Sequence, residues 1–210
     1  MPVDGRGTLR FADERPQIAA ERDQYIYYRG TQSVPFNAGP LLLNRPHSII
    51  AGVEVPEEGA DGVLVSFGGD DGGYVLYVQD GKLNYVQNYV SRDYLQVTSD
   101  VDVPARKHAL RFEFEVTGEP DISNGIGTPG TGRLFIDDEQ VGEAEFDHTT
   151  PLSLGLTGGI TVGADPGAPV CPFYQGPFDY EGEIMKVVFS VGGEAITDAE
   201  MELKRILARQ

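Results

Sequence analysis

The stretch FGGDDGGYVLYVQDGKLNYV (67–86) decides the fold class. It opens with a loop of glycine and aspartate, continues with an apolar run at 74–79, and reaches Asp80–Gly81 before a second apolar run. An Asp-Gly pair between two apolar runs is a strong hairpin signal, because a type I′ turn needs positive φ at both central residues. The stretch therefore predicts three strands that are joined by two turns.

The glycine content of the first loop also raises the alternative of a phosphate-binding loop. Such a loop opens a helix whose N-terminus faces the anion, and it carries a lysine beside Ser or Thr. Here a strand follows, the GGDDGG loop has no lysine, and Asp70 and Asp71 would repel a phosphate. Carboxylates do suit calcium, so a calcium role for Asp70 and Asp71 stays open although the EF-hand spacing is missing.

Similar short runs continue along the chain. In HALRFEFEV (108–116) apolar residues alternate with Arg and Glu, which is the period of a strand with one buried face. A further hairpin is predicted around Asp138–Glu139. About eleven short strands separated by Gly- and Pro-rich turns predict an all-β, two-sheet antiparallel sandwich.

The two ends of the chain differ from this pattern. Residues 1–22 show no sustained period and are predicted to be an irregular arm before a sandwich domain at 23–194. The segment 195–210 contains a T-x-x-E capping box and an apolar face at helical spacing. We expect one C-terminal α-helix there, packed on the sandwich or on a partner.

Composition excludes several functions. With 16 basic and 33 acidic residues the formal net charge is −17, which repels nucleic acid and anionic membranes, so neither is expected as a partner. A single cysteine, Cys171, allows no intramolecular disulfide and no four-cysteine zinc site. The sequence shows no signal-peptide pattern and no apolar run long enough to span a membrane, so a cytoplasmic location is expected.

Candidate catalytic residues are few. Glu113, Glu115 and Glu119 resemble the carboxylates of jelly-roll glycosidases, but their spacing departs from that pattern, and exposed charges on a strand explain them better. Cys171 has no basic neighbour in sequence to activate it. The three histidines lie in separate segments without ligand-spaced partners: His47, His108 and His148.

Five blocks of the sequence, taken in order, resemble the C-terminal region of long bacterial arylsulfatases. This resemblance covers about residues 44–191. The blocks are NRPHSIIAGVEVPEEGADGVLVSFGG, GGYVLYVQDGKLNYVQNYV, TSDVDVPARKHALRFEFEVTGE, TGRLFIDDEQVGEAEF and ITVGADPGAPV.

The resemblance implies a jelly-roll sandwich of the concanavalin A/laminin-G type, without the catalytic domain. The motif Cys-x-Pro-Ser-Arg or Ser-x-Pro-Ser-Arg, whose first residue becomes formylglycine, is missing, and Cys171 begins Cys-Pro-Phe-Tyr-Gln instead. We therefore expect no catalytic residue and no enzyme activity of the chain alone. The function implied is a structural, docking or substrate-shaping module for a sulfatase catalytic chain.

A second hypothesis is a carbohydrate-binding module of the lectin or laminin-G type, with a glycan as partner. Tyrosine-rich strands could stack on sugars, although the chain has no tryptophan. A jelly-roll glycoside hydrolase is a third and weaker alternative. No cofactor is expected other than a possible Ca²⁺. The candidate ligand-binding residues are Asp70, Asp71, Asp165, Tyr77 and Tyr85.

Overall fold

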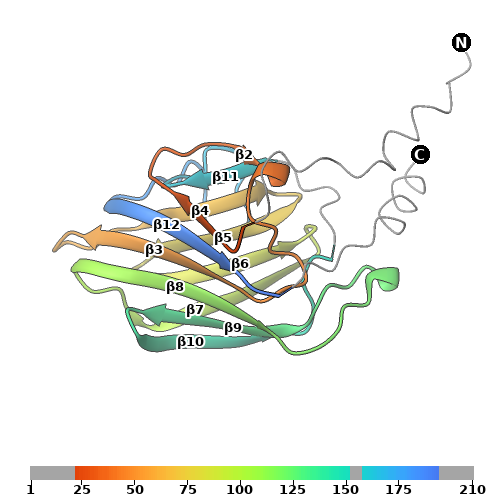
Figure 1. The fold of residues 1–210 in the computed structure, drawn as a ribbon. Coiled ribbons are helices and arrows are strands. Elements are labelled where there is room, and N and C mark those ends of the chain that lie inside the picture. Colours follow the sequence, from red (N-terminus) through yellow and green to blue (C-terminus); the bar gives the residue numbers. More distant parts are fainter. Residues whose placement is uncertain (1–21, 152–157, 194–210) are drawn as a thin grey trace, which may run out of the picture.

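The structure is a computed structural model, and it describes residues 22–151 and 158–193. Two six-stranded antiparallel sheets pack face to face as a sandwich (Figure 1). The first sheet has the order β1 (Gln24–Tyr27), β12 (Glu183–Val191), β3 (His47–Val55), β8 (Arg106–Val116), β9 (Gly130–Ile136) and β10 (Glu139–Phe146). The second has the order β2 (Val34–Pro35), β11 (Gly159–Val162), β4 (Gly62–Gly69), β5 (Gly72–Gln79), β6 (Lys82–Tyr89) and β7 (Asp93–Asp102).

This architecture confirms the predicted all-β, two-sheet jelly-roll sandwich. The short strands β1 and β2 were not predicted as separate elements, because a few residues carry too little periodicity. In the described residues the helical elements are two 3₁₀ turns, η1 (Phe36–Ala38) and η2 (Ile122–Asn124). The predicted arm at 1–22 falls almost entirely outside the described residues, and so does the predicted C-terminal helix.

The quoted stretch forms β4, β5 and β6, with tight turns between them as predicted. Asp80 and Gly81 both have positive φ, of 51° and 74°, as the Asp-Gly hairpin signal requires. Gly68 and Gly73 pair across the first turn, with φ of 97° and 140°. A Cβ at Gly73 would lie 1.9 Å from the carbonyl oxygen of Phe67, so glycine is required there.

The hairpin predicted at Asp138–Glu139 lies one residue earlier. Ile136 pairs with Glu139, so the turn residues are Asp137 and Asp138. Asp137 takes positive φ (55°), and its carboxylate accepts a hydrogen bond from the backbone N–H of Ala109 at 2.9 Å. This side-chain bond fixes the turn, and it could not be seen in the local sequence because Ala109 lies on β8.

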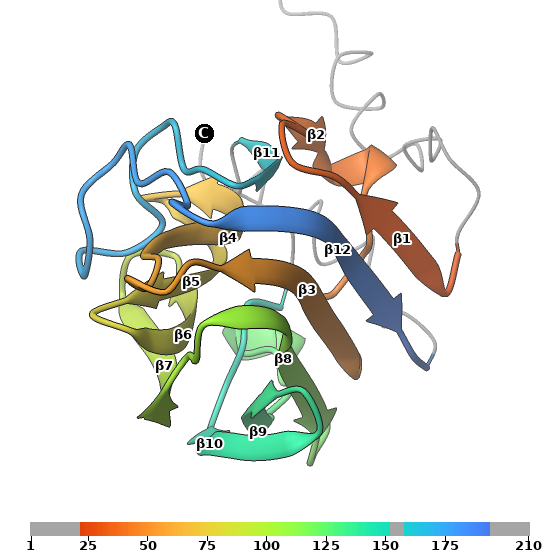
Figure 2. The same ribbon diagram turned by 90° about the vertical axis from the view of Figure 1, so that its left-hand side faces the viewer.

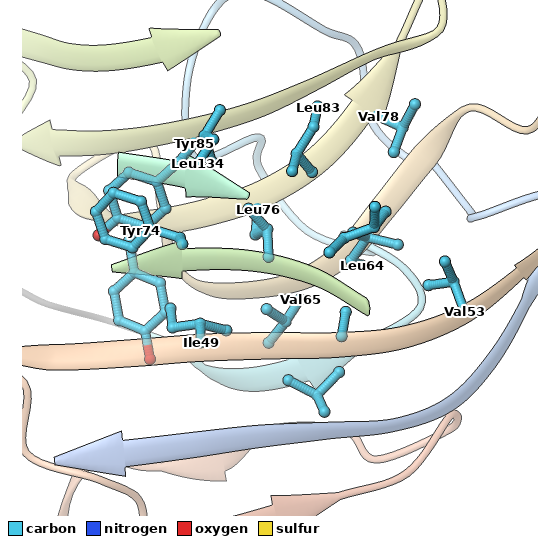
Figure 3. Packing of buried hydrophobic residues seen from close by; sticks show 14 of the residues in the cluster. Ile49, Val53, Leu64, Val65, Tyr74, Leu76, Val78, Leu83, Tyr85 and Leu134 are labelled. Carbon is cyan, nitrogen blue, oxygen red and sulfur yellow. The ribbon is translucent and has the colours of Figure 1, made fainter. Parts of the chain in front are cut away.

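The main core lies between the two sheets. Tyr85 of β6 stacks on Phe112 of β8, with ring centroids 3.5 Å apart and an interplanar angle of 8°. Figure 3 shows Tyr74 and Tyr85 at one end of this core and aliphatic side chains such as Leu64, Leu76 and Leu83 along the rest. The core thus joins the sheets through alternate residues of facing strands.

Candidate functional site

A second hydrophobic cluster covers the outer face of the β4–β6 sheet. The loop between β11 and β12 supplies its cover, and Figure 2 shows this loop, in blue, beside β4 and β5. Tyr77 of β5 lies under Tyr174 and Phe178, with ring centroids 5.2 Å and 6.4 Å away. The loop therefore closes off the outer face of β4, β5 and β6, and it leaves the outer face of β7 more open.

Asp165 anchors this covering loop. Its carboxylate is 3% exposed, and it accepts hydrogen bonds from the Tyr174 hydroxyl and from the Val170 N–H, the latter at 3.3 Å. Burial raises the pKa of the Asp165 carboxyl above its ordinary value, and the bond from Tyr174 opposes that rise. Asp165 therefore holds the loop together, and its oxygens face protein donors.

Asp70 and Asp71 form the turn between β4 and β5. The turn is held through its backbone, because the buried Asn88 amide donates to the carbonyls of Gly69, Asp70 and Val170, at 3.2, 3.1 and 2.8 Å. The Asp70 side chain is exposed and that of Asp71 is half-buried. Within residues 22–151 and 158–193, no group of three or more His, Cys, Asp or Glu side chains could hold a metal ion.

Tyr77 and Tyr85 lie on opposite faces of the same sheet. Tyr77 is 1% exposed under the covering loop, and Tyr85 is 2% exposed in the main core. Burial raises the pKa of both hydroxyls. Neither ring offers a face to a ligand in solution, so sugar stacking on these two tyrosines does not fit the structure.

Two further candidate groups, Glu115 and Cys171, are paired or buried. Arg133 bonds the carboxylates of Glu115 and Glu143 at 2.6 and 2.7 Å on the outer face of the first sheet, which is the surface-charge arrangement expected from the sequence. The thiol of Cys171 is 2% exposed, and burial raises its pKa to about 11. A thiol with such a pKa is a poor nucleophile at neutral pH.

An exposed strip follows the outer face of β7, beside the buried outer face of β6, where the covering loop ends. Phe173 of the loop is 42% exposed and lies edge-on to Tyr94, with ring centroids 5.8 Å apart. Beyond Tyr94, alternate residues of β7 face the same side. We call this surface the β6–β7 strip and define it as Tyr94, Gln96, Thr98 and Phe173, with the buried Asn84 of β6 beneath Thr98.

The polar side chains of the strip are ordered by one another. The Thr98 hydroxyl donates to the Asn84 side-chain oxygen at 2.7 Å, and the Gln96 amide donates to the Thr98 hydroxyl at 3.1 Å. Gln96 and Thr98 are exposed, so they keep further donors and acceptors for a ligand. From Tyr94 to Thr98 the strand extends about 13 Å at roughly 3.3 Å per residue.

The sequence predicts tyrosine-rich strands in this region but does not reveal the strip itself. Alternation in YLQVTS (94–99) puts Tyr94, Gln96 and Thr98 on one face, and this was the available signal. Phe173 could not be found in this way. It stands in an irregular loop, and its place beside Tyr94 depends on how that loop crosses the sheet.

The sequence matches no protein-family profile and no curated protein. Among solved structures, CBM40 of the Ruminococcus gnavus IT-sialidase matches 86% of this chain and 95% of its own, at 16% identity and a TM-score of 0.50. The same domain bound to α2,3-sialyllactose matches at 14% identity, 86% and 94% coverage and a TM-score of 0.49. Domains LG4-5 of mouse laminin α1 match 81% of this chain and 43% of theirs, at 14% identity and a TM-score of 0.48.

At these identities the comparison establishes the jelly-roll fold and nothing finer. The comparisons give no support to the resemblance to arylsulfatases. The described parts of the chain contain no helix capable of crossing a lipid bilayer.

Proposed function

We propose that the protein is a carbohydrate-binding module and that the β6–β7 strip is its binding surface. The observation that carries the proposal is the exposed ring of Phe173 beside a row of amide and hydroxyl side chains. Sugars present C–H faces, which pack on aromatic rings, and hydroxyls, which exchange hydrogen bonds with amides and alcohols. The fold gives further support, because CBM40 of the Ruminococcus gnavus IT-sialidase has the same architecture.

The strip favours a neutral glycan. Its members are aromatic, amide and hydroxyl side chains, and the chain as a whole carries a net charge of −17, which repels anions. The ammonium of Lys82, next to Asn84 on β6, bonds the carboxylate of Asp102 at 2.9 Å and the carbonyl of Asp100 at 2.9 Å. A sialylated ligand would have to compete with Asp102 for this cation.

The first experiment is a glycan array with neutral and sialylated sugars, run with and without calcium. We expect binding to neutral glycans that does not require calcium. If no glycan on the array bound, the carbohydrate hypothesis would be wrong. If only sialylated glycans bound, the proposal of a neutral ligand would be wrong.

Variants then locate the site on the best glycan of the array. Phe173→Ala removes the aromatic ring and should weaken binding about fivefold, since a contact with an aromatic ring contributes on the order of 1 kcal/mol. Met185→Ala is the matched control, because Met185 has similar exposure, 46%, but lies on the first sheet. If Phe173→Ala and Met185→Ala lost the same amount of glycan affinity, the strip would not be the binding surface.

The docking function for a sulfatase catalytic chain stays a prediction that rests on the five ordered sequence blocks. Its test is co-purification with sulfatase catalytic chains from the same genome. Association with such a chain, together with a flat glycan array, would favour docking over carbohydrate binding.

A further inference from the structure

A row of apolar side chains crosses the outer face of the first sheet. Cross-strand pairing places Ile26 of β1 beside Val188 of β12, and Val188 beside Ile50 of β3. Ile50 pairs in turn with Arg111 of β8, whose guanidinium lies 4.2 Å from the ring centroid of Phe135 on β9. We call the apolar side chains of Ile26, Val188, Ile50 and Phe135 the outer row. Figure 1 shows β12, β3 and β8, which carry the middle of this row, side by side.

The outer row points away from the main core. Side chains alternate between the two faces of a strand, and both strand neighbours of Ile50 are fully buried in that core. Ile26 is 46% exposed, and so is Met185 of β12, whose methyl group lies over Gly52 on the same face. Neither hydrophobic cluster of the described residues includes a member of the row. A contiguous apolar surface of this kind is typical of a contact with another segment or a partner.

The chain leaves the sandwich at the rim of this face. β12 ends at Val191, and the Gly192 N–H donates to the carbonyl of Pro46 at 2.9 Å. The buried Arg45 guanidinium donates to the carbonyl of Gly192, at 2.9 Å, and to that of Gly193. An open depression beside Gly192 reaches outer-face side chains of β12, β3, β8 and β9: Ser190, Ser48, Glu113 and Arg133. The residues that follow Gly193 therefore start next to the outer face.

The sequence of 195–210 suits this surface in pattern and in length. At helical spacing its apolar face consists of Ala199, Leu203, Ile206 and Leu207. A helix over 199–210 has a length of about 18 Å at 1.5 Å per residue. The outer row extends from β1 to β9 over about 19 Å, at roughly 4.8 Å between neighbouring strands. One such helix is therefore long enough to cover the row.

Charge sets the direction of such a helix. The last part of the segment, 204–210, contains three basic residues and no acidic residue. Next to Phe135 on β9, Arg133 bonds the carboxylates of both Glu115 and Glu143, at 2.6 and 2.7 Å. Two carboxylates that share one guanidinium leave this part of the face negative, and it attracts a basic segment. The charges therefore favour a helix whose basic end lies over β8, β9 and β10.

We propose that residues 195–210 form an amphipathic helix that packs on the outer row of the same chain. Its apolar face covers Val188 and Ile50, and its basic end lies over the carboxylates of Glu115 and Glu143. Because the chain leaves from β12, the helix runs from β12 toward β9. This face belongs to the first sheet and the β6–β7 strip to the second, so the helix leaves the proposed glycan surface open.

The test uses the full chain with a nitroxide label on a cysteine introduced by Ala208→Cys, on the polar side of the helix. Cys171 is buried and its pKa is about 11, so the label enters at position 208. Paramagnetic broadening in the ¹H–¹⁵N spectrum then reports which amides lie near the segment. We expect the amides of Ile50 and Val188 to lose most of their intensity and that of Thr98, on the β6–β7 strip, to keep it. Broadening centred on the strip, or on no part of the sandwich, would overturn the proposal.

A mixed sample separates the chain's own segment from a second copy. Labelled chain at natural isotope abundance is added to unlabelled ¹⁵N chain, and we expect no broadening. Broadening in the mixed sample would assign the outer row to a second copy of the chain, and the proposal would be wrong.

A pair of variants tests which side of the segment makes the contact. Leu207→Asp puts a charge into the apolar face and should abolish the broadening at Ile50. Met201→Asp is the matched control, because Met201 lies on the opposite side at helical spacing, and it should leave the broadening unchanged. Equal broadening in the two variants would show that the apolar face does not make the contact. Neither substitution touches the β6–β7 strip, so this proposal and the proposed function fail independently.

Discussion

Replacement of His47 by phenylalanine should change how the stability of the protein depends on pH. The folded protein holds His47 at a pKa of about 4, against 6.5 for an ordinary histidine. Above pH 6.5 the ring is neutral in both states. Between pH 6.5 and 4 the unfolded chain binds a proton that the folded chain does not, so stability falls as the pH falls. At about 1.4 kcal/mol per pKa unit, the loss attributable to His47 reaches about 3 kcal/mol at pH 4.

The measurement is urea unfolding of wild type and His47→Phe at several pH values from 7 to 4. The chain has no tryptophan, so tyrosine fluorescence and circular dichroism report the transition. The difference in unfolding free energy between the two proteins should shift by about 3 kcal/mol in favour of the variant over this range. Tyr85→Phe changes the same part of the core, because both His47 and Tyr85 contact Phe112, without removing a group that titrates in this pH range, so its dependence of unfolding free energy on pH should run parallel to that of wild type. If the unfolding free energies of wild type and His47→Phe differed by the same amount at every pH, burial would not lower the pKa of His47.

Three further predictions concern the covering loop and the turn that it contacts. Gly73→Ala should lower the unfolding free energy by about 2 kcal/mol or more, because Gly73 has a φ of 140° and its Cβ would overlap the Phe67 carbonyl. Gly167 has open space around it, so the control Gly167→Ala should change the unfolding free energy by less than about 0.5 kcal/mol. Tyr174→Phe removes the hydrogen bond that the Tyr174 hydroxyl donates to the buried Asp165 carboxylate, and so loosens the covering loop. A thiol reagent should then modify the buried Cys171 about tenfold faster. An unchanged rate would show that the Tyr174–Asp165 bond does not hold the loop. Asn88→Asp sets a carboxylate against three carbonyl oxygens and should destabilise the fold more than Asn88→Ala does, as measured by urea unfolding; the reverse order would contradict the role given to this amide.

The strand pattern could be predicted because each signal for it is local. The Asp-Gly turn at Asp80–Gly81 and the alternation in 108–116 depend only on neighbouring residues, and the structure confirms both. The β9–β10 turn was placed one residue late, because the bond from Ala109 to Asp137 joins residues 28 positions apart.

The candidate site was harder to predict for the same reason. Period 2 shows that Tyr77 and Tyr85 point to one face or the other of a strand, but it does not show which face another segment covers. The irregular loop covers the outer face and buries Tyr77, while the opposite sheet buries Tyr85. Phe173 comes to the surface from that same loop, so its role depends on tertiary packing that local sequence does not encode.

The central claim is that the β6–β7 strip binds a neutral glycan. It is tested most directly by ¹H–¹⁵N NMR titration of the wild-type chain with the best neutral glycan of the array. We predict saturable shifts centred on Tyr94, Gln96, Thr98 and Phe173, and their loss in Phe173→Ala. Shifts that cluster elsewhere on the sandwich, or none at glycan concentrations up to the millimolar range, would contradict the account.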